Sequence, residues 1–343
     1  MKVTIKEVAK EANVSPSTVS RVISDSPQIS DKTKEKVREV INRLKYKPNA
    51  IARSLANNKS RIIGVVLPNE DQDLITNPFF IQAMKGMSEY AQKKKYYITY
   101  AFSEDEKSEY DNINNFITSN LVDGVCLLRA RPEDKSIKYL QQMDFPFVVI
   151  GRPEEADGML WVDNDNFQTT YNLVGELYKK GHRDISFIGA REEWNVTRDR
   201  LYGFKVACEM NRIPIEDKNI IMMPDFNEKD GAKAADILLE NSHPTAIIVE
   251  DDVLAFGVLN VFKEKNITDI SIIGFNNSPL AEFQTPKLSS VDINSHELGY
   301  YASKILIDYL EDNQRKINHY IVESKIIYRE SFREWFYIKK SLE

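Results

Sequence analysis

The chain has 343 residues, 42% of them hydrophobic and 29% charged, and a formal net charge of −6. It is longer than one small domain, and its composition is that of a folded globular protein, which excludes an intrinsically disordered chain. Its apolar runs, such as residues 62–67, have the length of a strand and fall far short of the about 20 residues of a membrane-spanning helix.

The net charge is divided unevenly along the chain. Residues 1–60 contain 13 Lys and Arg against 6 Asp and Glu, a net charge of +7, whereas the remaining residues have a net charge of −13. A basic first part on an acidic second part indicates that the first part binds a phosphate-bearing partner.

The cysteines and the N-terminus indicate the compartment. Cys126 lies in an apolar run and Cys208 in a helical stretch, so both are expected to be buried thiols, and two cysteines are too few for a disulfide framework. Residues 1–12 contain no apolar segment of the kind found in export signals. We therefore expect the protein to work in the cytoplasm.

Three helices are predicted in residues 1–46. Thr4 and Glu7 form a capping box, which starts a helix that runs to about Ala12. Ser15 followed by Pro16 starts a second helix, because serine is a favoured N-cap and proline fits the first helical position. A longer third helix begins after residue 30 and carries an apolar stripe along one side.

Two short helices followed by a third are typical of a helix-turn-helix DNA-binding domain. The second helix would enter the major groove with the polar side chains of Ser17 and Arg21 at the base edges. The alternative is a small three-helix domain with a solvated basic face, against which the polar outer side of the second helix counts. The predicted DNA contacts of this domain are Thr4, Ser15, Pro16, Ser17, Thr18, Ser20, Arg21, Ser30 and Thr33, with Lys32 also near phosphate.

A fourth, very short helix is predicted over residues 50–56. Pro48 ends the third helix and Asn49 is a good N-cap for the new one, but seven residues are too few for a stable helix in water. A partner or DNA must therefore fold it, and the apolar Leu55 has no local core to enter. Such a side chain inserted between base steps would open the minor groove. The alternative is a flexible linker.

Residues 3–56 resemble the DNA-binding head and hinge of the LacI/GalR family of bacterial transcription regulators. The resemblance implies that Pro16, Ser17 and Arg21 read bases. It also implies that the hinge helix packs against that of a dimer mate and wedges a leucine into a central base step. The hinge contacts implied in this way are Asn49, Ala52, Arg53 and Leu55.

Beyond residue 61 the pattern alternates between strands and helices. Strands are predicted over residues 62–67, 97–102, 125–128 and 147–150, and in a second series over 185–188, 220–223, 246–249 and 270–274. Helices are predicted between them, for example over residues 80–94 and 110–119. This alternation is typical of parallel α/β sheets covered on both faces, and two series predict two lobes. Residues 289–310 are expected to cross back and complete the first lobe.

The predicted organisation is a small all-α head on an α/β body of two parallel-sheet lobes. The domains are a helix-turn-helix domain over residues 1–46, a hinge over 47–60, an N-lobe over 61–161 with 292–323, and a C-lobe over 162–291 with 324–343.

An effector is expected in the cleft between the lobes, because ligands of open parallel sheets bind at the carboxyl ends of the strands. Arg, Asp and Asn suit sugar hydroxyls, and flat aromatic rings suit sugar faces. The residues alone thus predict a neutral polyhydroxylated ligand. Arg129 and Arg152 as surface charges, Asp163 as a helix cap and Trp194 as loop packing are open alternatives. The predicted site is Asn77, Phe79, Arg129, Arg152, Asp163, Trp194, Arg200, Phe226, Asp251 and Asn276.

The family resemblance continues through the body in residues 181–189, 200–204, 243–248 and 270–277. It implies a body like that of the periplasmic sugar-binding proteins, with two lobes and three crossovers. Arg200 matches the arginine that anchors the ligand in the family, and Phe226 falls where an aromatic ring packs on it. Asn276 stands where the family usually has an aspartate, so the ligand contacts of other members do not transfer as a set.

Three further stretches, residues 77–80, 162–166 and 196–201, resemble the maltose-operon repressors within that family. The resemblance implies a homodimeric repressor on a pseudopalindromic operator, released when maltose or a maltodextrin binds. Three alternatives stay open: an effector that strengthens DNA binding, another sugar, and a catabolite-control regulator that uses a phosphoprotein.

The sequence does not favour an enzyme. The four histidines are scattered, and none of the usual metalloprotease, hydrolase or nucleotide-binding motifs is present. The acidic run of Glu250, Asp251 and Asp252 lacks His or Cys and follows a strand, so helix capping explains it better than a metal. No cofactor and no metal are expected.

Overall fold

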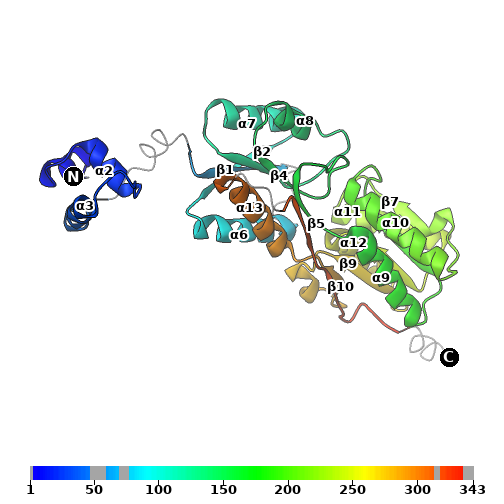
Figure 1. The fold of residues 1–343 in the computed structure, drawn as a ribbon. Helices are drawn as coiled ribbons and strands as arrows, with labels where there is room; N and C mark the ends of the chain where they lie inside the picture. The colour runs from blue at the N-terminus through cyan, green and yellow to red at the C-terminus, as the bar shows by residue number, and fades with distance from the viewer. Residues whose placement is uncertain (1–2, 47–58, 69–76, 313–316, 335–343) are drawn as a thin grey trace. The chain divides into compact units, whose positions relative to one another are not determined.

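The computed structural model describes residues 3–46, 59–68, 77–312 and 317–334 (Figure 1). The chain divides into two compact units, Met1–Ser60 and Arg61–Glu343. The predicted hinge helix lies outside the described residues, and with it Asn49, Ala52, Arg53 and Leu55.

The first unit contains the three predicted helices, α1 (Ile5–Glu11), α2 (Pro16–Ile23) and α3 (Asp31–Arg43). Each begins at the predicted cap: the side chains of Thr4, Ser15 and Ser30 accept hydrogen bonds from backbone N–H groups of the first turns. The helices enclose a small core of buried side chains, namely Val8, Ala9, Ala12, Val19, Val22, Val37 and Val40.

The second unit contains two six-stranded sheets in the part of the chain described (Figure 1). The first has the strand order β11 (His319–Val322), β5 (Leu160–Asn164), β4 (Phe147–Ile150), β3 (Gly124–Leu127), β1 (Ile62–Pro68) and β2 (Tyr97–Ser103). The second has the order β12 (Lys325–Ile327), β10 (Ser289–Asp292), β9 (Ser271–Phe275), β8 (Ala246–Val249), β6 (Ile185–Gly189) and β7 (Ile220–Met222). All these pairings are parallel except that of β10 with β12.

Paired helices cover the sheets. Against the first sheet lie α6 (Pro78–Lys93) with α13 (Ser295–Glu311), and α7 (Glu106–Thr118) with α8 (Lys135–Gln142). Against the second lie α9 (Asn166–Lys179) with α10 (Asn195–Met210), and α11 (Glu228–Asn241) with α12 (Asp252–Glu264). Strands buried on both faces explain why the sequence shows continuous apolar runs instead of alternation. The predicted α/β architecture is confirmed.

Glycines allow α6 and α13 to approach closely. A Cβ atom on Gly86 of α6 would lie 1.9 Å from the backbone oxygen of His296, and one on Gly299 of α13 would lie 1.9 Å from that of Ala83. The two helix backbones are therefore in direct contact, and α13 is fixed on the first sheet although it lies far from α6 in the sequence.

The chain passes between the two sheets three times, after β5, after β10 and after β11. Strand β5 continues in the first sheet to Asn164, so it spans the predicted lobe boundary at residue 161. The expectation that residues 289–310 cross back to the first lobe is wrong for Ser289–Asp292, which form β10 of the second sheet, whereas the predicted boundary after residue 291 lies at the end of this strand. The crossing takes place just after this strand, and α13 then joins the first sheet.

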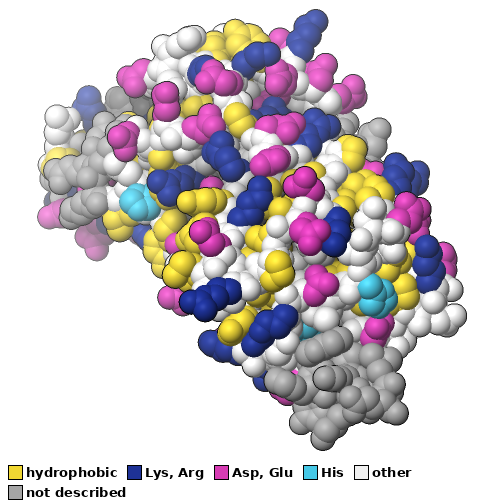
Figure 2. All heavy atoms as spheres, turned by 90° about the vertical axis from the view of Figure 1, so that its right-hand side faces the viewer, with side chains coloured by type: hydrophobic (Ala, Val, Ile, Leu, Met, Phe, Trp, Pro, Cys, Tyr) yellow, Lys and Arg dark blue, Asp and Glu magenta, His cyan; other side chains and the backbone are white. Residues whose placement is uncertain are grey.

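Charged side chains of both signs are interspersed on the face shown in Figure 2. Lys and Arg alternate with Asp and Glu on this face, so the excess negative charge of residues 61–343 does not gather into one acidic patch there. None of the helices described is long and apolar enough to cross a membrane.

Candidate functional site

One cavity of the second unit brings together all ten predicted effector residues, Asn77, Phe79, Arg129, Arg152, Asp163, Trp194, Arg200, Phe226, Asp251 and Asn276. They come from the carboxyl ends of strands in both sheets, where parallel α/β proteins bind ligands. The cavity volume is about 180 Å³, many times the about 10–15 Å³ needed to hold one water molecule. The cavity is therefore more than a packing defect, and the role of these residues in binding stays a prediction.

Arg200, on α10, is buried, with 5% of its surface exposed. Its Nε donates to Asn166 Oδ1 at 2.9 Å and its Nη1 to the Glu250 carbonyl oxygen at 2.7 Å. The guanidinium carbon lies 4.2 Å from the centre of the Phe275 ring. Its Nη2 makes no hydrogen bond with the residues described, and the side chain lines the cavity. Arg200 is thus held through Nε and Nη1, and its remaining edge is available in the cavity wall.

The positive charge of Arg200 is buried, and nearby carboxylates balance it. Burial lowers its pKa, whereas the nearby carboxylates of Glu250, Asp163 and Asp251 raise it. The carboxylate of Glu250 lies in the interior, where it accepts hydrogen bonds from Thr197 Oγ1 at 2.7 Å and from the Ala190 N–H at 3.0 Å. These carboxylates keep the arginine charged in a site from which water is largely excluded.

Asp163, at the end of β5, faces the cavity and does not cap a helix. It accepts hydrogen bonds from the backbone N–H of Arg152 at 2.8 Å and from Asn166 Nδ2 at 3.0 Å. The N-cap of α9 is Asp165, whose side chain accepts from the Gln168 N–H. The alternative of Asp163 as a helix cap is therefore wrong. Burial raises the pKa of Asp163 to about 6.

Asp163 is expected to make folding stability depend on pH. Its folded-state pKa of about 6 exceeds the 3.8 of an aspartate in water, so the folded protein holds this proton more tightly than the unfolded chain does. The contribution of this group therefore falls as pH rises from about 4 to about 6, by about 3 kcal/mol in all. Urea unfolding of the unmodified protein and of Asp163→Asn between pH 4 and 7 measures this, because all other groups titrate in both. A stability difference that stays constant with pH would contradict it.

Asp251 connects the two sheets across the cavity. As the N-cap of α12 it accepts from the Val253 N–H through Oδ1. Its Oδ2 accepts from Asn276 Nδ2 at 2.6 Å and from Asn77 Nδ2 at 3.2 Å. Asn77 in turn caps α6, which packs on the first sheet. The predicted capping function of this acidic run is confirmed for Asp251.

Two further contacts link the sheets at the side of the cavity. Asn195 Nδ2 donates to the Arg152 carbonyl oxygen at 3.0 Å, and Arg198 pairs with Glu154 at 3.0 Å. Arg152 also lies near an aromatic ring, with its guanidinium carbon 5.7 Å from the centre of the Trp161 ring. The start of α10 is thereby tied to the loop after β4.

Aromatic rings line the cavity from both sheets. Trp194 and Phe226 lie with ring centroids 5.1 Å apart and their planes tilted by 50°. Phe79, from the first turn of α6, packs edge-on against Phe80 at 5.2 Å. The cavity thus has flat apolar surfaces beside charged and amide groups, a combination that suits a sugar ring with its hydroxyls.

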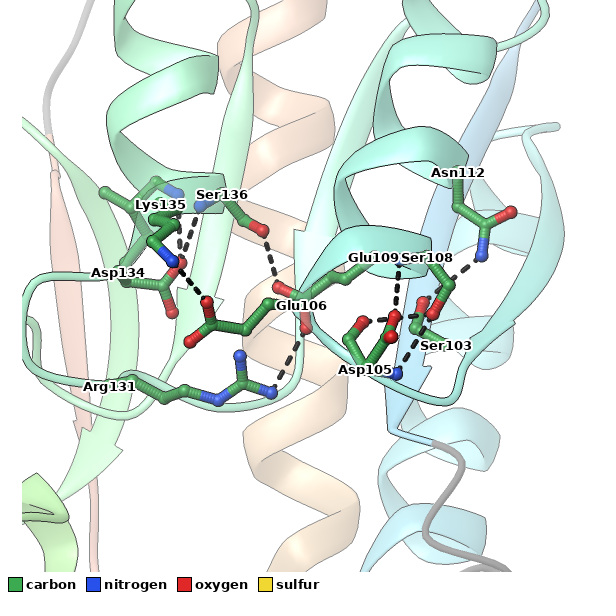
Figure 3. Close-up of polar contacts among 11 residues, drawn as sticks. Ser103, Asp105, Glu106, Ser108, Glu109, Asn112, Arg131, Asp134, Lys135 and Ser136 are labelled. Carbon is green, nitrogen blue, oxygen red and sulfur yellow. Dashed lines mark hydrogen bonds and ion pairs between the residues drawn. The ribbon is translucent and has the colours of Figure 1, made fainter.

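The loop that carries Arg129 is held by a network on its outer side (Figure 3). Glu109 of α7 is only 7% exposed; it accepts from Arg131 Nη2 at 3.2 Å and from Ser136 Oγ at 2.6 Å. Asp134 caps α8, and Lys135 pairs with Glu106 at 2.7 Å. Since Arg131 also lines the cavity, this network fixes one wall of it.

Several cavity residues were not predicted from the sequence, namely Arg131, Asn166, Asn195 and Asp225, and behind them Glu250 as a buried acceptor. Asn166 could have been found, because a buried arginine needs several acceptors and the amide follows a strand end. The others have no comparable signal, since their positions depend on contacts between distant segments.

In the first unit, the side chains of Pro16, Ser17, Ser20 and Arg21 are exposed along α2, as predicted. The guanidinium of Arg21 makes no hydrogen bond or ion pair with residues of the described ranges, whereas on α3 Arg38 pairs with Asp25 and Arg43 with Glu11. Arg21 is therefore exposed and unpaired among the described residues, as a DNA contact would require, and its contact with DNA stays a prediction.

The other predicted DNA contacts of the first unit take part in local hydrogen bonds. Ser15 Oγ bonds Ser17 Oγ at 2.7 Å and Thr18 Oγ1 at 2.8 Å. Thr4 Oγ1 donates to Glu7 at 2.9 Å, and the hydroxyls of Ser30 and Thr33 bond one another at 2.9 Å. A contact from these groups to phosphate would use their remaining hydrogen-bonding capacity.

Comparison with known families and proteins follows this division of the chain. Residues 4–49 match the family model for bacterial regulatory proteins of the lacI family, and residues 174–332 match the model for the periplasmic binding protein-like domain. The HTH-type transcriptional regulator MalR of Streptococcus pneumoniae is 36% identical over 318 residues, which is 92% of this chain and 94% of that protein.

Two other proteins are similar over most of their length. Catabolite control protein A of Priestia megaterium is 31% identical over 339 residues, covering 97% of this chain and 99% of that protein. The solved structure of a "probable maltose operon transcriptional repressor malR" from Staphylococcus aureus has a TM-score of 0.73 and 26% identity, covering 81% of this chain and 100% of that one. These relatives are transcriptional regulators and not enzymes.

Proposed function

The chain belongs to the LacI family of bacterial regulatory proteins, and we propose that it represses a maltose or maltodextrin utilisation operon. It would bind its operator in the cytoplasm as a homodimer and leave it when the sugar enters the cavity of the second unit. The observation that carries this proposal is the cavity itself, in which a buried arginine, amide groups and aromatic rings from both sheets converge.

DNA binding is a property of the family, and the exposed face of α2 supports the proposed contacts. Ser17 and Arg21 would lie at base edges in the major groove, and the net charge of +7 of residues 1–60 would attract phosphate. Two such domains in a dimer fit a pseudopalindrome with half-sites in successive grooves. We propose that Asn49, Ala52, Arg53 and Leu55 of the hinge contact the minor groove between them.

The chemistry of the cavity supports a neutral sugar. Arg200 offers free guanidinium donors, Asp163 and Asp251 offer acceptors, and Trp194 with Phe226 offers apolar surface. The choice of maltose rests on similarity to the Staphylococcus aureus protein, which is described as a probable maltose operon repressor.

The coupling between sugar and DNA would work through the arrangement of the two sheets. Asn77 with Asp251, and Asn195 with Arg152, already connect them beside the cavity. A sugar that forms hydrogen bonds with groups of both sheets would favour one arrangement of the two sheets. The change of arrangement would shift the hinge segments, which precede the first sheet in the chain. Couplings of this kind typically amount to about 1–3 kcal/mol and are reciprocal, so operator DNA would weaken sugar binding equally.

A second candidate function is that of a catabolite-control regulator, which uses a phosphoprotein as corepressor. The observation in its favour is the similarity of catabolite control protein A, which is 31% identical over 97% of this chain.

Operator binding titrated with maltose, maltotriose and unrelated sugars tests the proposal. We expect maltose or maltotriose to release the DNA at concentrations where sugars such as galactose do not. Tighter operator binding with maltose would reverse the sign of the effector. An operator affinity that ignores every sugar and rises with a phosphorylated protein would favour the second candidate.

Replacing Arg21 with alanine is expected to weaken operator binding by about 1–3 kcal/mol and to relax base preference at its contact, as the loss of a base-reading arginine does. Gel-shift titrations with the operator and with single-base variants measure both effects. Arg43→Ala is the control, since Arg43 is exposed, pairs with Glu11 and is not a predicted contact. Equal losses on all DNA sequences would reduce Arg21 to a phosphate contact.

A further inference from the structure

A second cavity adjoins the first and shares two lining residues with it. Phe79 and Asn276 line both cavities, and each cavity has a volume of about 180 Å³. The second is bounded by α6, by the loop after β9 and by the crossing that leads from β10 into α13. It thus also lies between the two sheets, and a ligand longer than the first cavity could extend past Phe79 and Asn276 into it.

The lining of the second cavity is rich in groups that bond hydroxyls. Gln82, Asn294 and Asp292 are half-buried in its wall. The side-chain amides of Gln82 and Asn294 make no hydrogen bond with any residue in the described ranges, and each offers both donors and an acceptor. Asp292 accepts from the Asn294 N–H at 2.8 Å and from Asn277 Nδ2 at 3.3 Å, and Lys325 lies 3.9 Å away, so part of its acceptor capacity is used within the protein.

The start of α13 supplies backbone donors to the same cavity. Asn294 is the N-cap of this helix, but its side chain makes no capping hydrogen bond. The first N–H groups of a helix have no partner within the helix. Ser295 and His296, the first residues of α13, line the cavity, so these donors lie at its edge.

Three asparagines around this cavity have left-handed backbone conformations. Asn276 has a φ of 96°, Asn277 of 46° and Asn294 of 54°. Asparagine adopts this conformation more readily than most residues other than glycine, so these positions shape the cavity wall at modest cost. The surrounding structure holds them, for example through Arg329 Nη2, which donates to Asn277 Oδ1 at 2.7 Å.

We propose that the second cavity is a subsite for an additional sugar ring of an oligosaccharide effector whose first ring or rings occupy the main cavity. Amide groups and backbone N–H donors are balanced by amide oxygens and by one carboxylate, which suits neutral hydroxyls better than an anion. The inference rests on the proposed function, because the main cavity must hold a sugar. It makes effector affinity depend on the length of the sugar.

Titration calorimetry with glucose, maltose, maltotriose and maltotetraose tests the subsite. We expect affinity to rise by about tenfold or more at the chain length that first enters the second cavity. Gln82→Trp fills this cavity and should remove the rise, while shorter sugars bind within about twofold of the unmodified protein. Gln82→Ala, which fills nothing, should reduce the rise by a smaller factor.

The control is Gln92→Trp, at an exposed position on the same helix that lines neither cavity. It should leave the whole series unchanged. If maltose binds but affinity does not rise with length, or if the rise persists in a folded Gln82→Trp protein, the subsite is wrong and the proposed effector stands. If none of the four sugars binds, both the proposed effector and the subsite are wrong.

Discussion

The Arg200→Lys protein is expected to bind its effector about a hundredfold more weakly than the unmodified protein, with operator affinity unchanged in the absence of sugar. The fixed fork of arginine explains this, since Nε and Nη1 are held by Asn166 and Glu250 while the remaining edge faces the cavity. Lysine keeps the positive charge, but its single ammonium group cannot bond Asn166, the Glu250 carbonyl oxygen and a ligand at once in this geometry. Hydrogen bonds to a charged group contribute about 1.5–3 kcal/mol each, and about 3 kcal/mol is a hundredfold in Kd.

Lysine is a sharper test than alanine. Alanine would leave the buried carboxylates of Glu250 and Asp163 without a balancing charge, which typically costs about 3–5 kcal/mol and confuses folding with binding. Arg198→Lys is the matched control, because Arg198 lies two residues earlier, is 48% exposed and pairs with Glu154. Calorimetry with sugar and gel shifts with operator are the measurements. If the Arg200→Lys protein binds sugar with unchanged affinity, Arg200 does not anchor the ligand.

Gly86→Ala is expected to lower the free energy of unfolding by about 2–3 kcal/mol, although alanine favours a helix over glycine by about 1 kcal/mol. The new Cβ would lie 1.9 Å from the His296 oxygen and 2.8 Å from the Tyr300 nitrogen, which are backbone atoms of α13 and cannot turn aside. Helices α6 and α13 would have to separate, and the apolar side chains between them would lose contact.

The same substitution at Gly175 provides the control. Gly175 lies within α9, and a Cβ there would meet nothing within 4 Å. Gly175→Ala should therefore stabilise the protein by about 0.5–1 kcal/mol through helix propensity alone. Chemical denaturation of both variants separates the two effects. If Gly86→Ala and Gly175→Ala proteins are equally stable, α6 and α13 accommodate the added methyl group without loss of stability, and the prediction is wrong.

The sequence predicts the strands whose apolar runs are long and continuous, and among the described strands it misses β5, β10, β11 and β12. Strands β1 and β8, buried on both faces, have an intrinsic pattern. Strand β10 consists of Ser289, Ser290, Val291 and Asp292, and only its position between β9 and β12 makes it a strand. For β11 and β12, likewise, the runs are short and only partly buried, and their pairing partners β5 and β10 are not adjacent in the chain.

The site was predictable to the extent that it follows from topology. The carboxyl ends of parallel strands converge, so polar residues after each strand meet in one cavity even though they are far apart in sequence. Contacts behind this layer were not predictable. The bond of Arg200 to the Glu250 carbonyl spans 50 residues, and nothing local marks that oxygen as an acceptor. The caps of Thr4, Ser15 and Ser30 were predictable because donor and acceptor lie within one turn.

The position of β11 and β12 has a consequence for the order of folding during synthesis. These strands form the outer edges of the two sheets, yet they follow all other strands in the chain. The three-helix unit has its own core and is complete once its last helix has left the ribosome. Neither sheet can acquire its last strand until some 270 residues later. A nascent chain therefore presents a finished DNA-binding unit well before its regulatory body closes.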